Sequence, residues 1–313
     1  MKTTLRVISV LIAFTIVACV LYPLIAMLVY NVFSWDYEPD RVFRRVWMFS
    51  VLAGLLIFRK TLGLQHPARA GFTLHSRSLG NLLTGFLVSC AFLFTLTLLY
   101  LAIDQWHYHP EMDEFFTYLI RGMVQGLLVA FIEEYIFRGL IFYALARRWG
   151  WLQAALFTSL IFSSLHFLEG HGENPLPDPT AWIAGFMVCG SMLANMSESF
   201  IFFPDAFGLF CVGMILCYAA WRTGSLWYGT GLHGGWVFYA KFVRVFIDYD
   251  LQIDRFIVGG SRMFNGIIPI FTMFIIFPVT WYLAKHKWIH VSPPPAGETG
   301  EASVEHKAQV AKG

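Results

Sequence analysis

The chain of 313 residues is too apolar for a soluble globular protein. Hydrophobic residues make up 57% and charged residues 13% of it, whereas soluble domains carry about 25% charged residues. The net charge of +2 gives no basic stripe of the kind that nucleic acid requires, so we expect no nucleic-acid partner. The composition therefore predicts an integral membrane protein, with the lipid bilayer as its solvent.

Apolar runs long enough to cross a bilayer, which takes roughly 20 residues, occur eight times. The predicted spans are residues 5–33, 42–58, 79–103, 116–146, 151–168, 206–221, 225–246 and 264–284. The first begins after Lys2 and Arg6 like a signal peptide, but its apolar run is too long for one, so we expect a retained anchor. A further apolar stretch, residues 182–193, is short and interrupted by polar residues, which favours a re-entrant or interfacial segment.

The distribution of basic residues predicts the orientation of this bundle. Loops on the cytoplasmic side carry an excess of Lys and Arg, and the loops 104–114, 169–178 and 248–254 are instead acidic. With both termini in the cytoplasm, the cytoplasmic residues are Arg59, Lys60, Arg69, Arg77, Arg147, Arg148, Arg222, Lys285 and Lys287, and the exceptions are Arg41, Arg44 and Arg45. We therefore predict a multi-pass protein of the cell membrane with both ends cytoplasmic.

The fourth span contains three charged residues, Glu133, Glu134 and Arg138. An ionisable side chain at the centre of a bilayer costs at least about 2.5–3.5 kcal/mol, which indicates a function. Glu134 and Arg138 are four residues apart with the acid first, the favourable order for an ion pair on a helix. Glu133 points about 100° away from Glu134, so we expect it to face other partners and to act as a general base.

Two histidines lie in other spans. His166 follows Gly150 at nearly the same sequence distance at which Glu133 precedes it, so a helical hairpin that turns at Gly150 places the two at one depth. His233 lies among four glycines of the seventh span, which allow close approach of helices or leave room for a substrate backbone. The sequence thus predicts an all-α bundle of about eight transmembrane helices with a polar intramembrane catalytic cavity.

The motifs Glu133-Glu134-x-x-x-Arg138, Phe162-x-x-x-His166 and His233, with the run 221–227 before the last of them, resemble the CPBP family of intramembrane proteases. That family includes the CAAX prenyl endoproteases and bacterial relatives linked to bacteriocin processing and immunity. The resemblance covers residues 123–239. It implies four segments: N-terminal transmembrane helices (1–115), a catalytic core (116–246), a C-terminal transmembrane helix (247–290) and a disordered cytoplasmic tail (291–313).

The resemblance also implies roles for the buried polar residues. Glu133 is expected to activate a water molecule, and Glu134 with Arg138 to shape the site. His166 and His233 are expected to orient that water, to bind a metal or to stabilise the oxyanion. Two histidines and a carboxylate are a ligand set for catalytic zinc, so a Zn²⁺ held by His166, His233 and Glu133 and a mechanism without metal both stay open.

One position departs from the family. Four residues after the last histidine the family often has Asn or Asp, and this chain has Val237. Asn195 or the amides of Gly234 and Gly235 are the candidates to replace that side chain.

The predicted function is hydrolysis of a peptide bond in a membrane-associated protein or peptide, of the CAAX or bacteriocin-leader type. Two other functions use the same residues: a proton-coupled transporter with a relay of buried Glu and His, and an inactive family member that acts as a scaffold.

Overall fold

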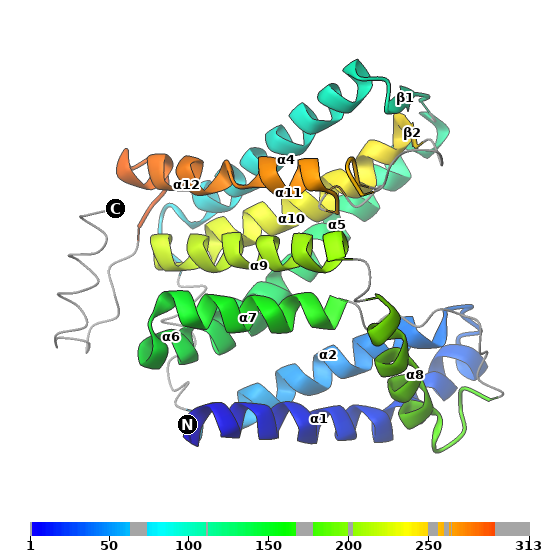
Figure 1. Ribbon diagram of the computed structural model, residues 1–313. Coiled ribbons are helices and arrows are strands. Elements are labelled where there is room, and N and C mark those ends of the chain that lie inside the picture. Colours follow the sequence, from blue (N-terminus) through cyan, green and yellow to red (C-terminus); the bar gives the residue numbers. More distant parts are fainter. Residues whose placement is uncertain are drawn as a thin grey trace. The chain divides into compact units, whose positions relative to one another are not determined.

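The computed structural model describes residues 2–62, 74–110, 112–166, 178–199, 203–249, 256–259, 263 and 265–291. These residues are almost entirely helical, which confirms the predicted all-α class (Figure 1). The chain forms two compact units: Met1–Gln65 with Ile161–Ala206, and His66–Leu160 with Phe207–Gly313. The predicted tail from residue 292 and most of the predicted acidic loop 169–178 lie outside the described residues.

The first unit is built from three helices. Helix α1 (Lys2–Met27) continues into a π-helix, η1 (Leu28–Val32), and is followed by α2 (Pro39–Ile57) and, later in the chain, by α8 (Ala184–Ser199). Pro39 begins α2 with its φ already set for a helix. The three helices bury one apolar core, which comprises Cys19, Tyr22, Ala26, Val42, Phe43, Ala184, Val188 and Met192.

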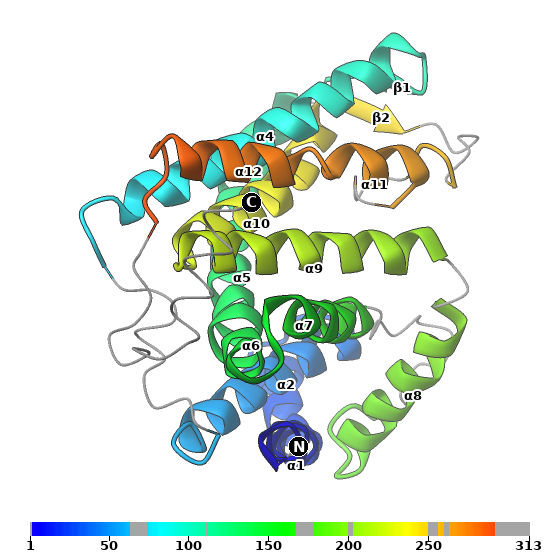
Figure 2. The ribbon, with the colours of Figure 1, turned by 60° about the vertical axis from the view of Figure 1, so that its left-hand side comes forward.

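The second unit is centred on α10 (Trp227–Phe242), which packs against both α4 (Ser78–Ala102) and α5 (Phe115–Glu134) (Figure 2). Glycines make this packing close. A Cβ atom at Gly231 would overlap the backbone carbonyl of Leu82 on α4, and one at Gly234 would lie 3.0 Å from a methyl carbon of Leu127 on α5. Of the two interpretations of these glycines, the structure therefore shows close approach of helices.

Other elements lie wholly or, for α7 and α9, partly in the second unit. They are β1 (Trp106–Tyr108), η2 (Met112–Glu114), η3 (Tyr135–Phe142), α6 (Tyr143–Trp149), α7 (Trp151–His166), α9 (Phe203–Thr223), η4 (Val243–Val245), β2 (Ile247–Tyr249), α11 (Ile267–Met273) and α12 (Ile276–Lys285). The two strands pair antiparallel, with Trp106 opposite Tyr249. The boundary between the two units falls within α7 and within α9.

Five helical stretches in the described part of the chain are long and apolar enough to cross a membrane: Leu5–Val32, Ser78–Ala102, Met112–Ala146, Asp205–Thr223 and Ile267–Lys285. The three other predicted spans are helical as well. However, α2 carries four charged residues near its start, and α10 has 16 residues, which is short for a bilayer crossing. Helix α7 is described only as far as His166. The chain is thus a multi-pass membrane protein, whereas the count of eight spans and the orientation stay predictions.

The long fourth span has an internal feature that its sequence did not predict. Helix α5 ends at Glu134, and the next eight residues form the π-helix η3. Helix α6 then ends at Gly150, whose φ of 81° lies in the left-handed region that glycine adopts without strain. The predicted turn at Gly150 between two helices is therefore present, and the residues that carry the charges lie where α-helix changes to π-helix.

Candidate active site

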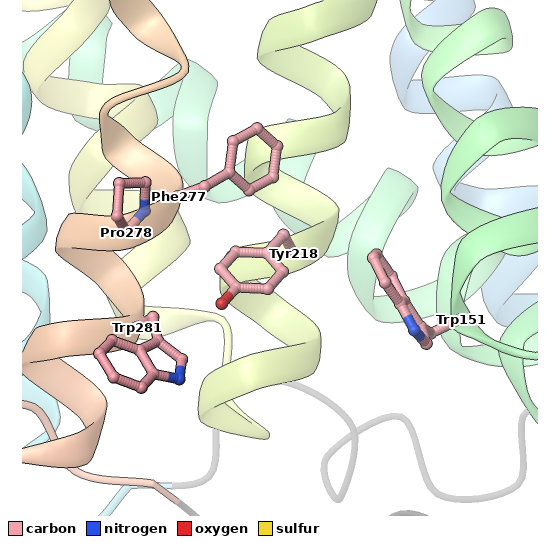
Figure 3. Close-up of a pocket in the computed structure, with 5 residues that line it drawn as sticks. All are labelled: Trp151, Tyr218, Phe277, Pro278 and Trp281. Atoms are coloured by element: carbon pink, nitrogen blue, oxygen red, sulfur yellow. The ribbon is translucent and has the colours of Figure 1, made fainter. Parts of the chain in front are cut away.

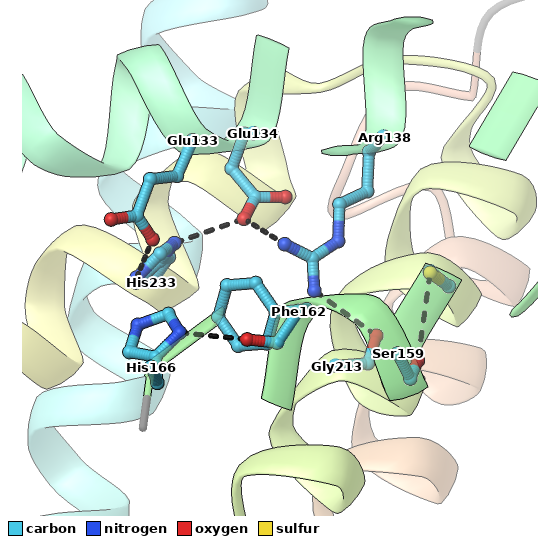
Figure 4. Close-up of polar contacts among 9 residues, drawn as sticks. Glu133, Glu134, Arg138, Ser159, Phe162, His166, Gly213 and His233 are labelled. Carbon is cyan, nitrogen blue, oxygen red and sulfur yellow. Dashed lines mark hydrogen bonds and ion pairs between the residues drawn. The ribbon is translucent and has the colours of Figure 1, made fainter. Parts of the chain in front are cut away.

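The predicted ion pair between Glu134 and Arg138 is present. The Arg138 guanidinium donates to Oε1 of Glu134 at 2.9 Å, and both side chains are fully buried (Figure 4). A second guanidinium nitrogen donates to the backbone carbonyl of Gly213 on α9 at 3.2 Å. Because a buried charge without a partner is strongly unfavourable, this pair holds the Glu134 side chain in one position.

His233, on α10, contacts both glutamates. Its Nδ1 atom lies 2.9 Å from Oε1 of Glu134, and its Nε2 atom lies 3.7 Å from Oε2 of Glu133 (Figure 4). The sequence predicted that Glu134 would be bound to Arg138 and that Glu133 would face the histidines. The structure adds that one oxygen atom of Glu134, Oε1, contacts both Arg138 and His233. Spacing along one helix could not show this contact, because His233 comes from another helix.

The hydrogen bond to Glu134 sets the tautomer of His233. An ionised carboxylate only accepts hydrogen bonds, so the proton of the imidazole is on Nδ1. In the neutral ring, Nε2 is then an acceptor that faces Glu133. A distance of 3.7 Å between Nε2 and Oε2 is longer than a direct hydrogen bond and is within the reach of one bridging water. The arrangement can therefore hold a water molecule between a carboxylate and an imidazole.

Burial distinguishes the two glutamates. The side chain of Glu133 is 16% exposed, whereas that of Glu134 is 1% exposed. A substrate can reach only a group with some exposure, so Glu133 is the carboxylate that is available for chemistry. The predicted polar cavity around it stays a prediction.

His166 ends α7 and lies in the first compact unit, whereas Glu133 and His233 lie in the second. Its Nδ1 atom is 2.9 Å from the backbone carbonyl of Phe162, and its ring packs on the Phe162 ring with centroids 4.4 Å apart. Since a carbonyl only accepts, the proton is on Nδ1 and Nε2 is an acceptor. Its Nε2 atom can therefore bind water or a metal ion. A contact of His166 with Glu133 and His233 stays a prediction.

A catalytic zinc site needs three protein ligands. Within the residues that the structure describes, no three side chains of His, Cys, Asp or Glu come together as such a set. The Oε2 atom of Glu133 and the Nε2 atom of His233, 3.7 Å apart, are two of the ligand atoms that such a site would need. A zinc site with His166 as the third ligand therefore stays a prediction.

Two of the candidates to replace a family Asn or Asp are backbone amides on the same helix as Val237. Val237 lies on α10 one turn after His233 and has an apolar side chain. Gly234 and Gly235 lie inside the same helix, where backbone amides bond to carbonyls four residues earlier, so their amides are already used. The side chain of Asn195 lies outside the described residues.

These observations define a class of protein: a helical membrane protein in which an imidazole is hydrogen-bonded to one buried carboxylate and lies 3.7 Å from a second. Residues 115–239, which include Glu133, Glu134, Arg138, His166 and His233, match the family described as Type II CAAX prenyl endopeptidase Rce1-like. This match agrees with the resemblance seen in the sequence. No curated protein and no solved structure matches the chain.

The description of that family is of an endopeptidase, an enzyme that cleaves a peptide bond within a protein. The matched residues lie close to the segment 123–239 on which the sequence resemblance was based.

Proposed function

We propose that this chain hydrolyses a peptide bond of a membrane-associated protein or peptide, of the CAAX or bacteriocin-leader type, and that Glu133 activates the water. The observation that carries the proposal is the placement of His233 between Glu134, at 2.9 Å, and the partly exposed Glu133, at 3.7 Å. General bases act within hydrogen-bond reach of the proton they remove or through one water molecule.

The proposed reaction begins with a water that donates one hydrogen to the Glu133 carboxylate and one to Nε2 of His233. Glu133 takes a proton as the water oxygen attacks the scissile carbonyl, which gives a tetrahedral intermediate. The carbon–nitrogen bond then breaks, and the same proton passes from Glu133 to the leaving amine. The products are a carboxylic acid and an amine, and Glu133 is again a carboxylate.

Glu134 and Arg138 are positioning residues in this proposal. The hydrogen bond from Nδ1 of His233 to Glu134 fixes the tautomer that turns an acceptor nitrogen toward the water. Arg138 in turn holds Glu134, through a contact of 2.9 Å, and is itself held by the Gly213 carbonyl. A side chain whose partners fix its rotamer keeps the site in the geometry that the reaction requires.

The test is cleavage of a prenylated CAAX peptide and of a bacteriocin-leader peptide by the purified protein. Glu133→Gln keeps the size of the side chain but removes its basicity, so we expect cleavage to fall by about 10²–10⁴-fold, the usual contribution of a general base, with near-normal expression. Glu114→Gln is the matched control, because Glu114 is exposed and precedes the same helix. Normal cleavage by the Glu133→Gln protein would refute the assignment of Glu133.

Glu134→Gln tests the division of roles. We expect it to lower thermal stability and to reduce turnover only in part, because an amide oxygen still accepts from His233 but carries no charge for Arg138. The reverse pattern, with Glu134→Gln inactive but stable and Glu133→Gln active, would exchange the two roles. A zinc ion at Glu133, His166 and His233 is the alternative mechanism. Removal of zinc by a chelator, with activity restored by added zinc, would establish it.

A further inference from the structure

An open groove with aromatic walls lies on the second compact unit, among α7, α9 and α12. It encloses about 420 Å³ and is lined by Trp151, Tyr218, Phe277, Pro278 and Trp281 (Figure 3). A volume of this size is within the range of protein pockets that bind small molecules. None of the five residues belongs to the candidate active site, so the groove has no role in the chemistry proposed above.

The walls of the groove are held in place by ring contacts. Trp151 stacks on Trp221, with ring centroids 4.8 Å apart and an interplanar angle of 18°. Tyr218 packs against Phe277, with centroids 5.1 Å apart. Rings that already pack on one another lose little freedom when a ligand binds, so the groove is prepared for an apolar ligand.

Positive charge lies at one end of the groove. The ammonium of Lys285 is 4.5 Å from the centroid of the Trp281 ring, and the Lys285 side chain is exposed. On α9, Arg222 follows Tyr218 by one helical turn, as Lys285 follows Trp281 on α12. Helices α9 and α12 run in the same direction (Figures 1 and 2), so both cations lie at the same end of their helices.

The helices that form the groove carry no acidic residue near Lys285. The sequences of α7 and α12 contain no Asp or Glu, and α9 has a single acid, Asp205, in its first turn, at the opposite end from Arg222. The groove therefore has apolar, aromatic walls and a positive charge at one end.

We propose that this groove is a binding site for one anionic phospholipid. An acyl chain packs against the aromatic walls, and the headgroup phosphate binds the ammonium of Lys285, while Arg222 adds positive charge at the same end. Aromatic rings are favoured at the boundary between lipid and water, and basic pockets between transmembrane helices bind anionic headgroups. Charge complementarity selects an anionic lipid over a zwitterionic one, whose headgroup also presents a cation.

The test is native mass spectrometry of the full chain in a neutral detergent. The protein is titrated with phosphatidylglycerol and, separately, with phosphatidylcholine that has the same acyl chains. We expect about fivefold tighter binding of phosphatidylglycerol, because a lysine near an anionic lipid contributes about 1 kcal/mol. Lys285→Gln should abolish this preference. Lys287→Gln is the matched control, since it removes the same charge from an exposed lysine two residues away, and it should retain the preference.

A second variant tests the apolar part of the site. Trp281→Phe keeps an aromatic ring but makes the wall smaller, so it should weaken the binding of both lipids. Equal affinity of the parent protein for the two lipids would overturn the proposal, and so would an unchanged preference in the Lys285→Gln protein. Displacement of phosphatidylglycerol by inorganic phosphate at a similar concentration would also overturn it, because the site would then bind an anion without its acyl chain.

Discussion

Two acid–arginine pairs, one in each compact unit, have the same spacing in the sequence and very different surroundings. In the first unit, Arg44 lies 3.5 Å from Asp40 on α2, and their side chains are 36% and 11% exposed. In the second unit, Arg138 lies 2.9 Å from Glu134, and their side chains are 0% and 1% exposed. Both pairs put the acid four residues before the arginine, the favourable order on a helix.

The difference between the pairs shows that spacing identifies a pair but burial decides what the pair does. In the α2 pair, water still reaches the arginine, which is 36% exposed, so that charge depends less on its partner. In the pair of Glu134 and Arg138, both charges have given up solvation, so each depends on its partner and on further hydrogen bonds. One such bond comes from a distant part of the chain, the imidazole of His233.

The largest effect is expected from removal of the buried arginine. Arg138→Ala leaves the Glu134 carboxylate buried without its cation, a loss that costs about 3–5 kcal/mol in other proteins. We therefore expect low expression, a much lower unfolding temperature in detergent and loss of cleavage. Arg44→Ala, the matched substitution in the α2 pair, should change all three much less, because the Arg44 side chain is 36% exposed and the Asp40 side chain is less deeply buried than that of Glu134. An Arg138→Ala protein that unfolds at the same temperature as the parent would contradict the role of the pair.

A smaller effect separates stability from positioning at the buried pair. If Glu134→Gln and Arg138→Met are combined, both charges disappear together, so the double variant should be more stable than the sum of the single variants predicts. Coupling between residues in contact is typically about 0.5–3 kcal/mol. Cleavage should stay reduced in the double variant, because His233 has lost its carboxylate partner. Recovery of full cleavage together with stability would show that Glu134 has no role in positioning His233.

The smallest effect is expected from the same cycle on the α2 pair. Because water reaches Arg44, which is 36% exposed, Asp40→Asn and Arg44→Met should combine almost additively, with a coupling of about 0.3–0.5 kcal/mol, the size measured for i,i+4 pairs on helices. Added salt should weaken that coupling, because ions screen the charge of the exposed arginine. Unfolding curves at low and high salt measure it. A coupling as large as that at Glu134 and Arg138 would show that burial does not separate the two pairs.

The sequence allowed prediction of features that depend on one helix. The pair between Glu134 and Arg138 follows from helical periodicity, and the turn at Gly150 follows from a glycine between two apolar runs. The hydrogen bond between Glu134 and His233 could not be predicted, because it depends on how α10 packs beside α5. The π-helix after Glu134 was also missed, since hydrophobic periodicity over one turn does not distinguish a widened turn from an α-helical one.

The composition predicted correctly that the chain is a membrane protein, but the apolar runs predicted the ends of the spans less well. Five predicted spans coincide with helices long and apolar enough to cross a bilayer within the described part of the chain. One other is shorter as a helix than its apolar run, because α10 is confined between Trp227 and Phe242. Apolar residues outside a helix count toward hydropathy but not toward a continuous crossing.

The π-helix η3 has a consequence for how the length of this chain can change. Each of its hydrogen bonds skips one residue more than an α-helical bond does, so the segment from Tyr135 to Phe142 contains slack that an α-helix lacks. Loss of a single residue there converts the widened turn into ordinary α-helix and leaves Glu133, which precedes it, in place. A deletion in this segment therefore shortens the helix without breaking it. If the lost residue lies between Glu134 and Arg138, however, the spacing of that pair changes.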